Sequence, residues 1–175
     1  MKTRFLVLAL TALLILGMSI TSALGTNVTY LGKTTWTATV SDTTVTGVKP
    51  GDTFTITGGI SKVGEEFYMF QGYVTPNTDG PFVVSGGGFL MGNTLIFTCS
   101  EAQQHTGASR DSGVMYITLD KTTLAGTFYD IGNDFDLSQR TFNQRYTAGN
   151  LALSGTPIPM GAGANLVPQQ LLLLN

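Results

Sequence analysis

Between residues 35 and 154 the chain alternates apolar and polar positions over short stretches that are separated by turn residues. Residues 35–41 and 53–57 put every second side chain, an apolar one, on one face and their threonines on the other. A period of two is the pattern of a half-buried strand. Lys49-Pro50-Gly51-Asp52 lies between them and has the proline and glycine that favour a turn. The pattern predicts two strands joined by a turn.

The same pattern recurs along the chain and predicts eight strands. They cover residues 35–41, 53–57, 66–75, 82–91, 94–100, 113–119, 123–131 and 141–154. No long segment of helical period follows residue 25, so no crossover helices are available to join parallel strands. Each link is short enough for a hairpin, which favours one antiparallel up-and-down barrel of about eight strands. A two-sheet β-sandwich is the alternative. The fold class is all-β.

The alternation also predicts which side chains are buried. Buried positions are Trp36, Ala38, Val40, Phe54, Ile56, Met115, Ile117, Leu119, Leu124 and Phe128. Exposed neighbours are Thr35, Thr37, Thr39, Thr53, Thr55 and Thr57. Gly86-Gly87-Gly88 within a predicted strand indicates a bulge or a sharp bend at a barrel corner.

The first 25 residues have the pattern of a secretory signal peptide. Lys2 and Arg4 precede the apolar run 5–18, and small residues end at Ala23-Leu24-Gly25. The run is shorter than the roughly 20 residues that span a bilayer. We therefore expect a secreted or periplasmic protein with no transmembrane helix after signal removal. Its barrel domain would cover residues 26–155, and a proline-containing tail, 156–175, would be poorly ordered or laid across the barrel.

Charge and single residues narrow the chemistry. Without the signal peptide, seven basic residues face eleven acidic ones and form no basic cluster, so a nucleic-acid partner is not expected. Cys99 is the only cysteine and is predicted to be buried. His105 is the only histidine, which excludes a multi-histidine metal site within one chain. Ser109, His105 and Asp111 could form a catalytic triad on paper, but no strand–turn–helix elbow accompanies Ser109. No catalytic residue and no cofactor are predicted.

One loop-like stretch, 130–136, is rich in oxygen ligands. Calcium binds such oxygens, and the candidate ligands are Asp130, Asn133, Asp134 and Asp136. Asp and Asn also form ordinary turns, and a solvated hairpin turn is the favoured interpretation.

Aromatic residues are the enriched chemistry of the predicted strands. They would either fill a packed core or line a cavity for a small apolar ligand. The candidate ligand-binding residues are Trp36, Phe54, Phe67, Met69, Tyr73, Phe97, Tyr116, Phe128 and Arg145.

Gly32-Lys33-Thr34-Thr35-Trp36 is similar to the opening of the calycins, the lipocalin-like and avidin-like barrels. The resemblance implies a late-strand arginine packed across the first-strand tryptophan, and Arg145 is the matching residue. Its strand parity would aim Arg145 into the barrel, unless a bulge at Gly149 turns it to solvent.

Three kinds of function follow from these patterns. The first is an exported barrel that binds a small apolar ligand. The second is an eight-stranded outer-membrane barrel, which requires the apolar face to point outward, or a structural surface protein. An enzyme on a calycin-like barrel is the least favoured, because it needs a group with a shifted pKa in a pocket.

Overall fold

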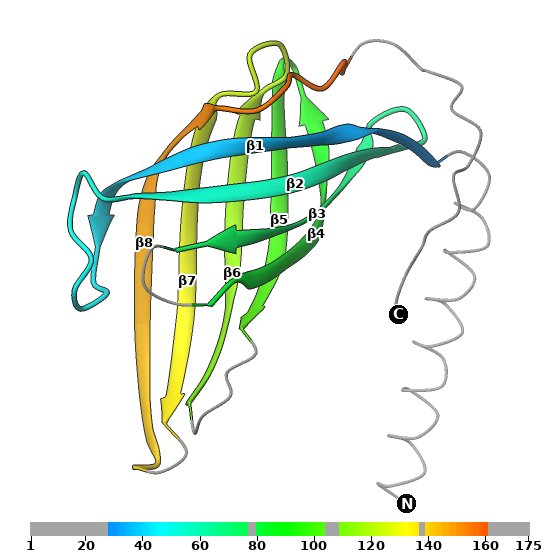
Figure 1. The fold of residues 1–175 in the computed structure, drawn as a ribbon. Helices are drawn as coiled ribbons and strands as arrows, with labels where there is room; N and C mark the ends of the chain where they lie inside the picture. Colours follow the sequence, from blue (N-terminus) through cyan, green and yellow to red (C-terminus); the bar gives the residue numbers. More distant parts are fainter. Residues whose placement is uncertain (1–27, 77–79, 104–108, 137–138, 161–175) are drawn as a thin grey trace, which may run out of the picture.

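The computed structural model describes residues 28–76, 80–103, 109–136 and 139–160. Their strands form one closed barrel in which each strand pairs antiparallel with the next and β8 pairs with β1 (Figure 1). This confirms the up-and-down barrel and excludes the sandwich. The strands are β1 (Val28–Thr43), β2 (Thr53–Val63), β3 (Phe67–Thr75), β4 (Phe82–Met91), β5 (Thr94–Gln103), β6 (Ser109–Asp120), β7 (Gly126–Asp136) and β8 (Thr141–Leu153).

The two-residue period decides which side chains point inward. Nine of the ten positions predicted to be buried are buried, and Phe54 is partly buried against the core. Thr53 and Thr55 are exposed as predicted, whereas the other four threonines are only partly exposed. Two of these four pack against each other across the strands, since Thr35 Oγ1 lies 3.3 Å from Thr57 Oγ1.

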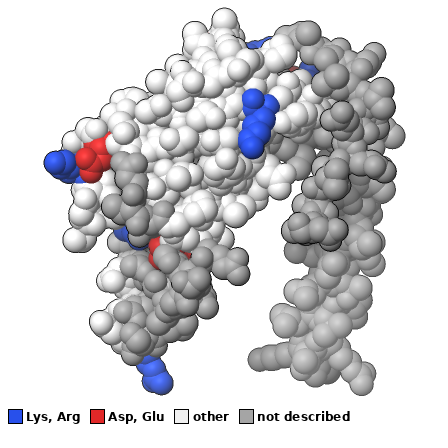
Figure 2. Space-filling view, viewed as in Figure 1, with Lys and Arg blue, Asp and Glu red and all other residues white. Residues whose placement is uncertain are grey.

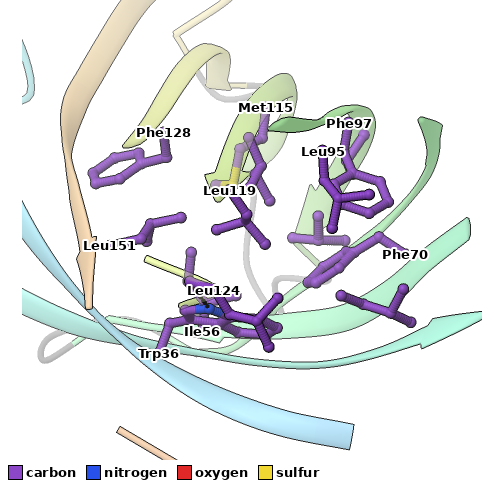
Figure 3. Close-up of a cluster of buried hydrophobic side chains, with 14 of the residues drawn as sticks. Trp36, Ile56, Phe70, Leu95, Phe97, Met115, Leu119, Leu124, Phe128 and Leu151 are labelled. Atoms are coloured by element: carbon purple, nitrogen blue, oxygen red, sulfur yellow. Dashed lines mark hydrogen bonds between the residues drawn. The ribbon is translucent and has the colours of Figure 1, made fainter. Parts of the chain in front are cut away.

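The apolar side chains converge from all sides of the barrel into one cluster (Figure 3). The rings of Trp36 and Phe70 lie 5.9 Å apart, and those of Phe70 and Phe97 lie 5.8 Å apart. Burial of each large apolar side chain contributes roughly 1.5–3 kcal/mol. The part of the barrel interior around Trp36, Phe70 and Phe97 is therefore a core packed with its own side chains.

The glycine run in β4 does not form the bulge that the sequence suggested. Pairing of β4 with β3 and β5 runs through Gly86, Gly87 and Gly88 without a shift in register. Instead, a Cβ on Gly86 or Gly88 would overlap a main-chain carbonyl oxygen of β5. Glycine is needed here because β5 passes too close for a side chain, and β4 curves sharply along this stretch (Figure 1). Register shifts occur in β1 instead.

The chain after β8 crosses the upper end of the barrel in Figure 1. There Ile158 and Met160, in the part of the predicted tail that the structure describes, are buried against the core. The predicted signal peptide, 1–25, and residues 161–175 lie outside the described residues. No helix in the described part of the chain is long and apolar enough to cross a membrane. An apolar cluster fills the barrel interior, whereas the interior of an outer-membrane barrel is polar. The outer face also carries exposed large apolar side chains, among them Phe67, Met91 and Phe142.

Candidate functional site

The inward positions of β5 to β8 change from apolar to polar along the strands. In β5 the inward residues run from Phe97 and Cys99 to Glu101 and Gln103, all of them buried. Strand pairing aligns the inward positions of the four strands in rows. The rows are Phe97–Ile117–Phe128–Gly149, then Cys99–Met115–Asp130–Thr147, then Glu101–Gly113–Gly132–Arg145. The change to polar side chains therefore begins at Asp130 and Thr147.

Two glycines separate Glu101 from Arg145 in the third row. A Cβ on Gly113 would lie 2.6 Å from Oε1 of Glu101, and a Cβ on Gly132 would lie 3.2 Å from Nε of Arg145. The Glu101 carboxyl and the Arg145 chain thus occupy the space that side chains of β6 and β7 would otherwise fill. The sequence makes room for a charged cluster by leaving out two side chains.

Glu101 and Asp130 form a hydrogen-bonded carboxyl pair next to Gly113 and Gly132. Burial, together with the charge and hydrogen bond of Asp130, raises the pKa of Glu101 to about 8. Burial also raises the pKa of Asp130 to about 6, although the hydrogen bond from Glu101 and the charge of Arg145 act in the opposite direction. Glu101 therefore keeps its proton and donates a hydrogen bond to Asp130, because two close buried carboxyl groups do not both ionise.

Arg145 is paired with Asp111 from β6. Its Nη2 donates a hydrogen bond of 2.8 Å to Asp111 Oδ2, and the two side chains are 23 % and 8 % exposed. Arg145 is partly exposed because the β1–β8 pairing ends at Thr43 and Thr147. Beyond that point a shallow depression of about 230 Å³ reaches Arg145 from outside. It is lined by Thr44, Tyr129, Ile131, Gln144, Arg145 and Tyr146.

Two buried oxygen atoms near this cluster accept no hydrogen bond from the protein. They are Asp130 Oδ1 and Gln103 Oε1. The orientation of the Gln103 amide follows from its Nε2, which donates a 2.6 Å hydrogen bond to the carbonyl of Gly80. Both atoms are therefore acceptors, and an unsatisfied buried acceptor costs roughly 1–3 kcal/mol.

The structure does not bring the aromatic candidates together. Trp36, Phe97 and Phe128 are buried in the packed core, and Phe54 packs edge-on against Phe128 at 5.2 Å. The outer wall instead carries Phe67, Met69, Tyr73 and Tyr116, which are 40–60 % exposed. These eight residues do not line a common cavity.

The stretch of calcium candidates is a strand instead of a hairpin turn, because β7 continues to Asp136. Asp130 points into the barrel, whereas Asn133 has the opposite strand parity and points outward. The side chains of Asp134 and Asp136 lie outside the described residues. Among those that are described, no three acidic, histidine or cysteine side chains could hold a metal ion together.

Arg145 points inward, as its strand parity predicts, since the β7–β8 register has no shift at Gly149. Its predicted contact with Trp36 is wrong. Trp36 pairs with Leu153, eight residues along β8 from Arg145, and this is roughly 26 Å at 3.3 Å per residue. The Arg145 guanidinium pairs with the Asp111 carboxylate instead.

Cys99 is fully buried as predicted, and burial raises the pKa of its thiol to about 12. His105 and the side chain of Ser109 lie outside the described residues. The connection between the predicted strands 94–100 and 113–119 is shorter than predicted, because β5 extends to Gln103 and β6 begins at Ser109.

The face drawn in Figure 2 carries few Lys, Arg, Asp and Glu atoms. Lys33 lies over the Tyr73 ring, with Nζ 5.5 Å from the ring centre. The face seen there has no basic patch of the kind that binds phosphates.

The strand pattern does not predict Glu101, Gln103 or the role of Asp111, because residues 101–112 are mostly polar and lie between the predicted strands 94–100 and 113–119. A signal was present. The parity of Phe97 and Cys99 continues into Glu101, and that of Met115 continues back to Asp111. If the two-residue period of these strands is continued through the polar residues, it predicts that Glu101 and Asp111 point into the barrel.

Comparison with models of protein families, with curated proteins and with solved structures finds no match to this chain. The likeness to calycins consists of the closed eight-stranded barrel.

Proposed function

We propose that this protein is an exported binding protein that takes a small ligand at the polar end of its barrel interior. Export is supported by the signal-peptide pattern of residues 1–25. Binding is supported by one observation above all, the buried acceptors Asp130 Oδ1 and Gln103 Oε1, which receive no hydrogen bond from the protein. A ligand with hydrogen-bond donors would satisfy them.

The polar end is preferred to the aromatic end as the binding position. The aromatic side chains that would have lined an apolar cavity fill the core themselves or lie on the outer wall. A purely apolar ligand is therefore less well supported than one with a polar group. The depression beside the β1–β8 seam gives a ligand a way to reach Arg145 from outside.

An enzyme is the second candidate, favoured by the shifted pKa values of Glu101 and Asp130. A binding function is preferred because the Glu101 proton is already hydrogen-bonded to Asp130 and Glu101 is only 7 % exposed. A general acid needs its proton within hydrogen-bond reach of the substrate.

Native mass spectrometry of the protein, purified from its own host, tests the binding function. We expect a small molecule that co-purifies with the protein and is lost in the Asp130→Asn variant. The matched control, Glu65→Gln in the exposed turn after β2, should keep the molecule. The proposal fails if the protein carries no ligand and no compound in a thermal-shift screen raises its melting temperature.

A further inference from the structure

The outer wall of the barrel carries a group of large apolar side chains near one of its ends. They belong to the start of β1, the start of β3 and the end of β4, and each of them is 46–61 % exposed. The group, which we call the apolar rim, consists of Val28, Tyr30, Phe67, Met69, Phe89 and Met91. All six are uncharged.

Strand pairing places these side chains next to one another. Phe67 pairs directly with Phe89 across β3 and β4. On its other side Phe67 pairs with Val63, which in turn pairs with Val28. Directly opposed residues of antiparallel strands share a face, with Cβ atoms about 4.5–5.5 Å apart. The two methionines of the apolar rim lie two residues from these phenylalanines, so they are on the same face. The apolar rim is therefore one continuous surface.

The wall itself does not require large apolar residues at outward positions. The outward positions of β2, which lies between β1 and β3, hold only small residues along most of its length. They are Thr53, Thr55, Thr57, Gly59 and Ser61. Exposed phenylalanine and methionine on the neighbouring strands are thus left for another surface to cover.

The apolar rim is large enough for the centre of a stable interface. A large aromatic side chain buries roughly 150–250 Å² when it is fully covered, so six half-exposed side chains offer on the order of 500–700 Å². The largest apolar patch of a typical monomer is about 300–600 Å². Each partner in a stable complex contributes about 800 Å², its polar border included.

We propose that the apolar rim packs against the same surface of a second copy of this chain and forms a two-fold homodimer. A two-fold interface brings a patch against itself, so like charges within the patch would repel. The apolar rim meets this condition, because none of its residues is charged. This inference is independent of the proposed ligand binding, which concerns the barrel interior.

A lipid surface is a less well supported partner. The turn between β2 and β3, directly before Phe67, carries Glu65 and Glu66, and both are exposed. Proteins that lie on membranes strengthen their attachment with Lys and Arg, which attract anionic lipids. At the border of a dimer, by contrast, the two carboxylates stay in water, as is usual for the polar edge of an interface.

Sedimentation velocity of the full chain, as its host exports it, tests the proposal at concentrations from about 0.1 to 100 µM. We expect a reversible monomer–dimer equilibrium with a dissociation constant of about 10 µM or tighter. The series should stop at the dimer, because a two-fold contact uses the apolar rim of both copies. A chain that is monomeric throughout this range, or that forms ever larger oligomers, overturns the proposal.

A matched set of variants locates the contact. Phe67→Thr combined with Phe89→Thr should weaken the dimer about tenfold or more, because it removes the central pair of the apolar rim. Phe142→Thr is the control, since Phe142 is 64 % exposed near the other end of the outer wall. It should leave the dissociation constant unchanged. Circular dichroism shows whether each variant keeps the fold. Equal effects of the double variant and the control overturn the proposal.

Other occupants of the apolar rim would give different results. If the chain is monomeric and floats with phosphatidylcholine vesicles, and Phe67→Thr with Phe89→Thr abolishes flotation, the partner is a lipid surface. If the chain is monomeric and becomes dimeric when Leu172→Ser and Leu173→Ser are combined, its own C-terminal segment covers the apolar rim. Either result overturns the homodimer.

Discussion

The indole Nε1 of Trp36 donates a 2.8 Å hydrogen bond to the main-chain carbonyl of Leu124, 88 residues along the chain. The bond joins β1 to the turn between β6 and β7. Leu124 is in the left-handed region, with φ of 54°, which costs a non-glycine residue roughly 1–2 kcal/mol. Asp120 fixes the turn by accepting hydrogen bonds from the main-chain N–H groups of Thr122 and Thr123. The strained carbonyl is thus aimed at the indole, and both are buried.

Trp36→Phe should therefore destabilise the protein more than a change of ring size alone. It leaves the Leu124 carbonyl buried without its donor, and we expect a loss of about 2–4 kcal/mol in the free energy of unfolding. Chemical denaturation followed by circular dichroism measures this. Tyr116→Phe, on the outer wall, is the control and should change stability by less than about 0.5 kcal/mol. Equal losses in the two variants would contradict the role of the indole bond.

The glycine run of β4 allows a comparison between adjacent residues. Gly86→Ala places a methyl group against the main chain of β5 and should destabilise the barrel by about 3 kcal/mol or prevent folding. Gly87 points outward, and its nearest atom is the Tyr68 carbonyl oxygen at 3.9 Å. Gly87→Ala should be neutral or stabilise by about 0.5–1 kcal/mol, since alanine loses less backbone entropy in a strand. Melting temperatures of both variants check this, and a stable Gly86→Ala protein would show that β5 can move away.

Strand number, order and facing were predictable because the period of two is strong wherever threonine alternates with large apolar residues. Trp36, Ala38 and Val40 show this in β1. The bend at Gly86 was predictable as a special position, but whether it was a bulge or a close approach depends on a neighbouring strand. That neighbour, β5, cannot be read from the local sequence.

The polar end of the barrel was less predictable for a physical reason. Sequence patterns assign polar residues to solvent, because a lone buried charge is too costly. Glu101 and Asp111 are inside only because Asp130, Arg145 and the two glycines at 113 and 132 compensate them from other strands. Which groups compensate a buried charge depends on how the strands pair, and no single segment of the sequence specifies that pairing.

Arg145→Ala should lower the melting temperature clearly more than Arg140→Ala. The first removes the guanidinium that pairs with Asp111 at 2.8 Å, while Arg140 is exposed between β7 and β8. Because Arg145 is partly exposed, the expected loss is about 1–3 kcal/mol, below the value for a fully buried pair. A double-mutant cycle with Asp111→Asn should show that the two losses do not add. Equal melting temperatures for the two arginine variants would argue that the ion pair contributes nothing to the fold.

The proton held by Glu101 makes stability depend on pH in a direction opposite to that of most carboxylates. The pKa of Glu101 is raised to about 8 in the folded chain, against about 4.3 when unfolded. Between these values the folded chain binds a proton that the unfolded chain has lost. The stabilisation that comes from this proton is therefore complete below about pH 4, and it is lost as the pH rises towards 8. Asp130, with its pKa raised to about 6, acts in the same direction.

We therefore expect the free energy of unfolding to be lower at pH 8.5 than at pH 5 by about 2–4 kcal/mol. Glu101→Gln keeps the shape and the hydrogen bond to Asp130 but cannot ionise, so it should remove most of this pH dependence. Glu65→Gln, in an exposed turn, should leave the pH dependence as it is in the unmodified chain. Urea denaturation at the two pH values measures all three proteins. A pH dependence that survives in Glu101→Gln would mean that other groups cause it, and that Glu101 is already ionised in the folded barrel.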